Sequence, residues 1–169
     1  MSIKWVQFPL HPETPQEGLS LEELFAASNL DIPAIQGHLR ELMRLEGLPY
    51  GNRTHTYNSR IAQELSKWAE RFPESSMLNQ KIFEAYFANG QNLADQNLLI
   101  QLAGETGLST KEAAEVLKNR VYKEAVDIDW MRSRQIGISG VPTFVIGQYG
   151  ISGAQSYEML ERFVVENTL

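Results

Sequence analysis

The chain contains no cysteine among its 169 residues. Disulfides, thiol nucleophiles, thiolate metal ligands and dithiol redox chemistry are therefore excluded for its own residues. No apolar run is long enough to predict a membrane-spanning helix. Lysine and arginine number 15 against 21 aspartates and glutamates, a formal net charge of −6. This acidic balance argues against nucleic acid or an anionic membrane as the main partner.

Hydrophobic residues make up 43% of the sequence, enough for a substantial buried core. The length suits one domain with an inserted subdomain. The chain starts directly with a strand-like pattern, without a signal peptide before it, so we expect a cytoplasmic location. His11, His38 and His55 match no metal-ligand spacing, and no carboxylate completes a ligand set. We therefore expect no metal and no cofactor.

The pattern of apolar residues predicts one strand, many helices, a hairpin and a final helix. Residues 3–8 alternate apolar and polar side chains, which is typical of a half-buried strand. Residues 20–119 are helical in pattern, and residues 122–136 predict a further helix. Helix starts are predicted at Ser20 with Glu23, at Asp31, and at Ser109 with Glu112. Strands at 143–146 and near 151–152 and a last helix follow, so the fold class is α/β (α+β by content, mostly helical).

One short stretch, Gly140-Val141-Pro142-Thr143, precedes the strand at 143–146. Proline removes a backbone donor just where a strand begins, so it needs an explanation. Two readings are open from the residues alone. Pro142 is either a trans proline at the first position of an edge strand, or a cis proline in a tight turn at a binding site.

Longer stretches of the sequence resemble the DsbA-like branch of the thioredoxin superfamily, in particular the bacterial DSBA oxidoreductase or FrnE-like group. Kappa-class glutathione transferases and 2-hydroxychromene-2-carboxylate isomerases are similar at a greater distance. The matching stretches are FPLHPETPQEG (8–18), EGLPYGNRTHTYNSRIAQELSKWA (46–69), FEAYFANGQNLAD (83–95) and GISGVPTFVIGQYGISGAQSYEMLE (137–161).

The resemblance implies a thioredoxin-like core, residues 1–12 and 138–169, with an inserted helical subdomain and connecting helix at 13–137. It implies that the Val141–Pro142 bond is cis and that the backbone at Val141, Pro142 and Thr143 pairs with an extended peptide or protein thiol substrate.

The first strand–helix unit of the family, which carries the reactive C-x-x-C or a serine, has no counterpart in this sequence. A missing central strand would leave unpaired edges on its two neighbours. We therefore expect a second copy or a partner chain in the gap, or direct pairing of the strand at 3–8 with that at 143–146. A third possibility is that the sequence is a fragment of a longer product.

Two polar stretches are weaker candidates for the site. In THTYNS (54–59) a helix-capping role for Thr56, Asn58 or Ser59 is favoured, while the resemblance makes Asn58 a candidate at the substrate groove. In Ser152-Gly153-Ala154-Gln155 a tight turn is favoured over a ligand loop. In glutathione-binding relatives an acidic or hydroxyl residue stands where this chain has Ala154 and Gln155, so glutathione binding is doubtful.

The three tryptophans, Trp5, Trp68 and Trp130, predict packing in the core or between subdomains rather than an aromatic site. The main functional hypothesis is a protein of thiol–disulfide oxidoreductase lineage that is catalytically incomplete because it has no cysteine. One alternative is a redox-silent module that binds peptide or protein. The other is a glutathione-dependent transferase or isomerase relative.

Overall fold

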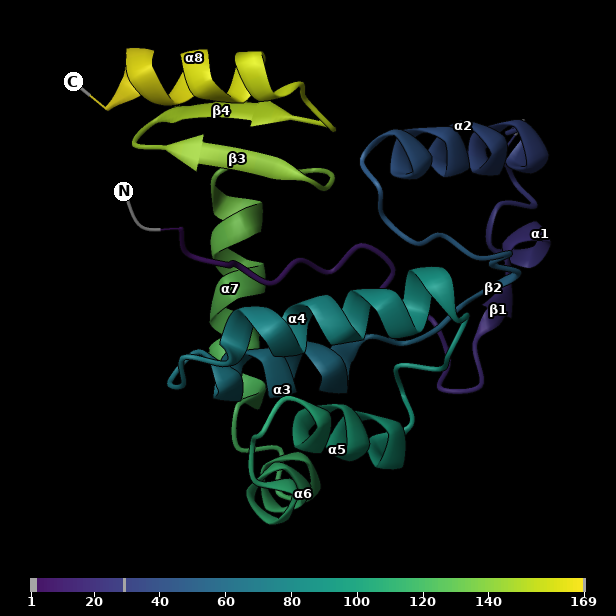
Figure 1. The fold of residues 1–169 in the computed structure, drawn as a ribbon, viewed down its shortest axis with the longest axis vertical. Coiled ribbons are helices and arrows are strands. Elements are labelled where there is room, and N and C mark those ends of the chain that lie inside the picture. The colour runs from purple at the N-terminus through teal and green to yellow at the C-terminus, as the bar shows by residue number, and fades with distance from the viewer. Residues whose placement is uncertain (1–2, 29, 169) are drawn as a thin grey trace. The chain divides into compact units, whose positions relative to one another are not determined.

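A computed structural model describes residues 3–28 and 30–168 of the chain. These residues form two compact units. The helical unit comprises residues 11–126, and the hairpin unit comprises residues 1–10 with 127–169. Figure 1 shows the elements of each unit and helix α7 (Lys123–Gln135), which begins in the first unit and continues into the second.

Helices account for most of the helical unit, together with one two-residue strand pair. The strands β1 (Leu19–Ser20) and β2 (His55–Thr56) pair antiparallel. The helices are α1 (Leu21–Leu24), α2 (Ile32–Leu45), α3 (Arg60–Ala69), α4 (Ser75–Phe83), the π-helical turn η1 (Glu84–Ala88), α5 (Gln96–Glu105) and α6 (Thr110–Lys118).

The predicted helix caps are confirmed by side-chain hydrogen bonds. Ser20 and Glu23 form a complete capping box at the start of α1. The Asp31 carboxylate accepts a hydrogen bond from the N–H of Ala34 at the start of α2. The Ser109 hydroxyl accepts one from the N–H of Glu112 at the start of α6. Each bond satisfies a backbone donor that has no partner within its helix, which fixes where the helix begins.

Helices α3 to α6 and the loops that join them surround one apolar core. Its largest members are fully buried: Leu65, Trp68, Leu78, Leu99 and Leu117. Burial of each such side chain contributes roughly 1.5–3 kcal/mol. Trp68 also packs edge-on against Phe72, with the ring centroids 5.1 Å apart, so the core packing predicted for this tryptophan is confirmed.

A buried carboxylate ties the start of α3 to the turn before α7. Glu64 is 1% exposed and accepts hydrogen bonds from Arg60 Nε at 2.8 Å and from Arg120 Nε and Nη2 at 2.7 Å each. Arg60 Nη2 also donates to the backbone carbonyl of Lys123. The two guanidinium groups compensate the cost of burying the Glu64 charge.

The hairpin unit contains β3 (Thr143–Ile146), β4 (Tyr149–Ser152), the second half of α7, and α8 (Tyr157–Asn167). The strands pair antiparallel, with Thr143 opposite Ser152 and Ile146 opposite Tyr149. Gly147 permits the tight turn between them because its φ is +59°. The Ser156 hydroxyl caps α8. The strands and the final helix therefore lie where the sequence predicts them.

The predicted strand at 3–8 is wrong: these residues are extended, but none is assigned to a strand. A strand requires a neighbour that completes its hydrogen-bond ladder, and β3 pairs with β4 alone within the described residues. The N–H of Gln7 instead donates to the Asp129 carboxylate at 3.0 Å. Direct pairing of residues 3–8 with 143–146 is therefore not formed. Core packing of Trp5 is not observed either, because its side chain is 52% exposed.

Candidate functional site

The segment from Gly140 to Thr143 is held in place by hydrogen bonds within itself and to the end of β4. Its Val141–Pro142 peptide bond is cis, as the resemblance implied. The carbonyl of Pro142 accepts a hydrogen bond from the N–H of Gly153 at 2.8 Å. The Thr143 hydroxyl donates to the Gly140 carbonyl at 2.7 Å and lies 3.0 Å from the Ser152 hydroxyl. These contacts fix the approach to β3.

The structure brings the second predicted stretch, residues 152–155, beside this segment. Ser152 lies opposite Thr143 in the β3–β4 register. Gly153, with a φ of +87°, presents its N–H to Pro142. The Gln155 side chain donates back to the carbonyl of Ser152 at 2.7 Å. The amide of Gln155 therefore supports the turn itself, in agreement with the turn interpretation.

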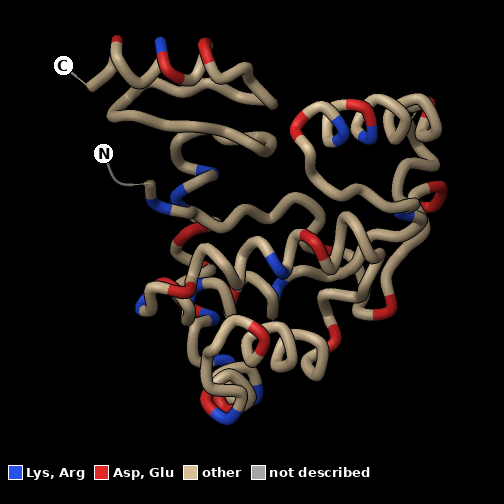
Figure 2. The backbone as a smooth tube through the Cα atoms, in the orientation of Figure 1, with Lys and Arg blue, Asp and Glu red and all other residues tan. Residues whose placement is uncertain are grey.

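The backbone of Val141 is unpaired. The residue is 50% exposed, and neither its N–H nor its carbonyl has a hydrogen-bond partner within the described part of the chain. The flanking sequence carries no charge, because no lysine, arginine, aspartate or glutamate occurs from residue 135 to residue 157. Figure 2 shows β3, β4 and the turn between them free of charged positions. A free amide and carbonyl on an uncharged surface can pair with an extended peptide irrespective of its sequence.

Asn58 lies in the other unit and is fully used there. Its amide donates to the carbonyl of Thr14 at 2.7 Å, and its side-chain oxygen accepts from the N–H of Arg60 at 3.0 Å. Asn58 thus caps the start of α3 and anchors the loop that follows residue 11. The capping interpretation is supported, and the structure gives no position for Asn58 relative to Val141.

Two of the three histidines pack against aromatic rings. His11 packs edge-on against Phe25, with ring centroids 6.1 Å apart, and His55 stacks on Tyr57. Within residues 3–28 and 30–168, no three histidine, aspartate or glutamate side chains are grouped to hold a metal ion. No helix in the described ranges is long and apolar enough to cross a bilayer.

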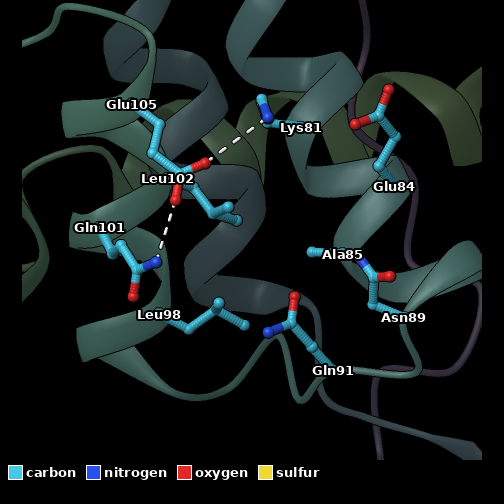
Figure 3. Close-up of a pocket in the computed structure, with 9 residues that line it drawn as sticks. All are labelled: Lys81, Glu84, Ala85, Asn89, Gln91, Leu98, Gln101, Leu102 and Glu105. Carbon is cyan, nitrogen blue, oxygen red and sulfur yellow. Dashed lines mark hydrogen bonds and ion pairs between the residues drawn. The ribbon is translucent and has the colours of Figure 1, made fainter.

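A shallow hollow of about 160 Å³ lies between η1 and α5 in the helical unit. Figure 3 shows its polar rim, with Lys81 and Gln101 both reaching Glu105. Lys81 Nζ is 3.5 Å from one Glu105 oxygen, and Gln101 donates to the other at 2.9 Å. The Gln101 bond lowers the pKa of Glu105 most, and the charge of Lys81 lowers it further. Three of the rim groups, Lys81, Gln101 and Glu105, therefore interact with one another.

Sequence reasoning missed η1 and the residues around Arg53. The π-helical turn carries Tyr86 and Phe87, which flank the Arg53 guanidinium. An arginine in a loop that precedes a helix gives no local signal of this kind, because its aromatic neighbours come from a distant part of the sequence. The recurrence of aromatic residues in two of the family-like stretches, 46–69 and 83–95, was the available hint.

Known proteins resemble this chain in both sequence and structure. YwbO of Bacillus subtilis, an uncharacterized protein, is 29% identical over 65% of this chain and 55% of its own length. A probable DsbA oxidoreductase of Streptomyces coelicolor is 25% identical in a superposition with a TM-score of 0.83, over 94% of this chain and 72% of that one. A 2-hydroxychromene-2-carboxylate isomerase shares the fold, with a TM-score of 0.71 and 18% identity over 80% of this chain and 66% of that one.

The comparisons show the family to which the chain belongs. The chain spans just over half the length of the curated relative that it matches. The model of one family, described as a DSBA-like thioredoxin domain, matches residues 1–165. The fold is therefore a DsbA-like thioredoxin fold with a helical insertion, related to disulfide oxidoreductases, in a sequence without cysteine. The chain belongs to the DSBA-like thioredoxin domain family.

Proposed function

We propose that the chain binds peptide or protein thiol substrates for thiol–disulfide exchange, while residues outside this sequence supply the reactive cysteines. The substrate contacts Val141, Pro142 and Thr143, and it adds its backbone to the free N–H and carbonyl of Val141. The unpaired backbone of Val141, in a residue that is 50% exposed, is the observation that carries the proposal. Membership of the DSBA-like thioredoxin domain family supports the redox chemistry.

The other candidate residues have supporting roles in this proposal. Ser152 contacts Thr143 and Gly153 donates a hydrogen bond to Pro142, and these contacts fix the substrate segment, residues 141–143. Gln155 stabilises the turn at residues 152–155. Asn58 positions the loop at residue 14 and the start of α3. A homodimer or a partner chain that contributes a strand beside β3 is part of the proposal, as is a cytoplasmic location, which cell fractionation tests.

A second candidate is a binding module without redox activity. The absence of cysteine favours it, since the substrate segment is intact while no residue of the chain can exchange a disulfide. Glutathione-dependent catalysis is less supported, because the Gln155 amide is already used by the Ser152 carbonyl and Ala154 offers no polar side chain.

Peptide binding is tested on the chain itself by NMR. An extended peptide that contains a disulfide-bonded cysteine is titrated into labelled protein, and the amide resonances of Val141 and Thr143 are followed. The matched control is the same peptide with a single N-methyl group at the residue that pairs with Val141. Loss of one backbone hydrogen bond weakens binding about two- to tenfold. Equal binding of both peptides, or shifts confined to the helical unit, would contradict the proposal.

Redox activity distinguishes the two candidates. The chain alone is expected to leave insulin disulfides intact. The chain joined to a family strand–helix segment with a C-x-x-C pair is expected to reduce insulin in the presence of dithiothreitol faster than the segment alone. If the joined protein folds and binds peptide but adds no rate, the module without redox activity is the correct interpretation.

A further inference from the structure

Arg53 lies in an unusual environment within the helical unit. Its Nη1 donates to the hydroxyl of Tyr86 at 2.6 Å. Its guanidinium carbon is 5.1 Å from the centroid of the Tyr86 ring and 5.6 Å from that of Phe87. Aromatic rings at these distances stabilise a cation through their π-electron faces. The Arg53 cluster, as we call it, consists of Tyr50, Arg53, Thr56, Tyr86 and Phe87.

The cluster contains no negative charge to match the arginine. Within the described residues, no carboxylate forms an ion pair with Arg53, whereas Arg44, Arg60 and Arg120 each have a glutamate partner. Arginine is the side chain best suited to bind a carboxylate, because its planar group offers paired N–H donors. A half-buried arginine without a carboxylate partner is therefore ready to receive one.

Two polar atoms of the cluster are buried and lack a hydrogen-bond partner in the described structure, Arg53 Nε and Tyr50 Oη. Buried donors without partners are rare, and each one calls for an explanation such as a bound molecule. The Tyr50 ring stacks on Phe87, with centroids 6.5 Å apart. Both unpaired atoms thus belong to residues that pack on the same ring, which places two unmatched polar groups beside Phe87.

The backbone around the cluster is built to hold these residues together. Tyr86 and Phe87 lie on the π-helical turn η1. This conformation is rare in proteins overall, and where it occurs it is often at a functional site. The carbonyl of Phe87 accepts a hydrogen bond from the N–H of Gly51 at 2.9 Å. A Cβ atom at residue 51 would lie 2.0 Å from the carbonyl oxygen of Ala88, so only glycine permits this approach. The segment of Tyr50 and Arg53 is thereby pressed against η1.

The neighbouring histidine is shifted away from its charged form. Burial lowers the pKa of His11 below its usual value, and the positive charge of Arg53 lowers it further. Both effects disfavour a second positive charge beside Arg53. The hollow of Figure 3, on residues 81–105, is a weaker candidate because its lysine, Lys81, already pairs with Glu105.

We propose that the Arg53 cluster is a binding site for a carboxylate attached to an aromatic or apolar group. The carboxylate pairs with the Arg53 guanidinium, and the apolar part packs against the aromatic side chains of the cluster. The ligand is a free organic acid or an acidic side chain next to an aromatic one in a peptide. This site concerns the helical unit only and does not depend on the proposed function.

The test uses phenylacetate as the probe and the complete 169-residue chain. Titration is followed by NMR through the backbone amides of residues 50–56 and 84–88 and the Nε–H of Arg53. Phenylacetate is expected to give saturable shifts there, with affinity about tenfold higher than that of the neutral isostere phenylacetamide, since the amide forfeits a charge-assisted hydrogen bond. This comparison needs no substitution, so it stays valid whether or not variants fold.

Two variants assign the effect to Arg53. Arg53→Gln is expected to weaken phenylacetate binding about tenfold. Arg71→Gln is the matched control, because Arg71 also lies over an aromatic ring, that of Phe72 at 5.0 Å, in the same unit, and it is expected to leave binding unchanged.

The source of the carboxylate is read from a second pair of probes, acetyl-Phe-Glu-amide and acetyl-Phe-Gln-amide. Higher affinity for the glutamate peptide than for phenylacetate supports the proposal with a peptide as the ligand. Higher affinity for phenylacetate supports it with a free organic acid as the ligand. Equal affinity for phenylacetate and phenylacetamide, equal losses in Arg53→Gln and Arg71→Gln, or the absence of saturable shifts would each overturn the proposal.

Discussion

The two units of the molecule differ sharply in how much apolar surface they bury. Every buried apolar side chain of the described structure belongs to the helical unit. In the hairpin unit the side chains classed as buried are the polar Asp129 and Ser133, while Phe144 and Val145 of β3 remain 39% and 43% exposed. The stability of the chain therefore resides in the helical unit, and the segment that we propose to bind substrate, residues 141–143, lies on the less packed unit.

This difference has a physical cause in the sheet. A thioredoxin-like layer needs several strands to bury its side chains, and an isolated two-stranded hairpin is marginal in water. Within the described part of the chain, residues 3–8 pair with no strand, and β3 has a neighbouring strand on one side only. Exposed strand edges of this kind pair readily with another chain, which is consistent with a peptide-binding role for the segment at Val141.

The largest expected difference between the units comes from truncating one apolar side chain in each. Leu65→Ala in α3 removes a side chain that is 0% exposed and is expected to lower the free energy of unfolding by about 2–5 kcal/mol. Val145→Ala in β3 is its counterpart and is expected to cost less than about 1 kcal/mol. Urea unfolding followed by tryptophan fluorescence measures both. Similar losses for the two variants would show that the hairpin unit has a core of its own.

Substitution of the buried carboxylate sharpens the comparison through pH. Burial acts to raise the pKa of Glu64, but hydrogen bonds from Arg120 and Arg60, together with their charges, outweigh it and lower the pKa. Because the pKa is lower in the folded state, the ionised carboxylate stabilises the protein at pH values above its unfolded-state pKa of about 4.3. This stabilisation is lost as the pH falls through the folded-state pKa. We expect Glu64→Gln to cost about 1–3 kcal/mol at pH 7 and to flatten the fall in stability below pH 4.5.

Glu41→Gln is the matched control for that measurement. Glu41 also pairs with an arginine, Arg44, at 2.7 Å, yet both side chains are more than half exposed. Its unfolding midpoint at pH 7 is expected to stay close to that of the unmodified chain, since exposed ion pairs contribute little. A Glu41→Gln loss as large as that of Glu64→Gln would contradict the role assigned to burial.

The smallest effect lies within the helical unit itself. Helix α2 has no buried residue, and its Leu45 side chain is 66% exposed. Leu45→Ser is therefore expected to change the free energy of unfolding by less than about 0.5 kcal/mol, in contrast to Leu65→Ala. A loss comparable to that of the core substitution, measured by the same urea titration, would mean that α2 is packed in solution.

The sequence predicts the local features of this fold well and the long-range ones poorly. Caps at Ser20, Asp31 and Ser109 follow from hydrogen bonds between near neighbours, and such bonds are visible in the order of residues. The strand at 3–8 failed because alternation shows that a segment can be extended but not whether a neighbouring strand exists. The pair β1–β2 was missed for the same reason, since its partners lie 35 or more residues apart.

The candidate site divides in the same way. The segment at Val141–Thr143 and its brace at 152–155 follow from family-like residues that are close in sequence, and the structure joins them through Thr143 and Gly153. Arg53, in contrast, meets Tyr86 across 33 residues. No spacing rule connects the two, so the Arg53 cluster is visible only once the helices are packed.

Native-state hydrogen exchange of the 169-residue chain tests the central contrast most directly. Amides of α3, at Arg60–Ala69, are expected to exchange only on global unfolding. Amides of β3 and β4 are expected to exchange by local opening, at free energies well below the global value. Equal protection of α3 and β3 would contradict the account, because it would require a hairpin unit as firmly packed as the helical one.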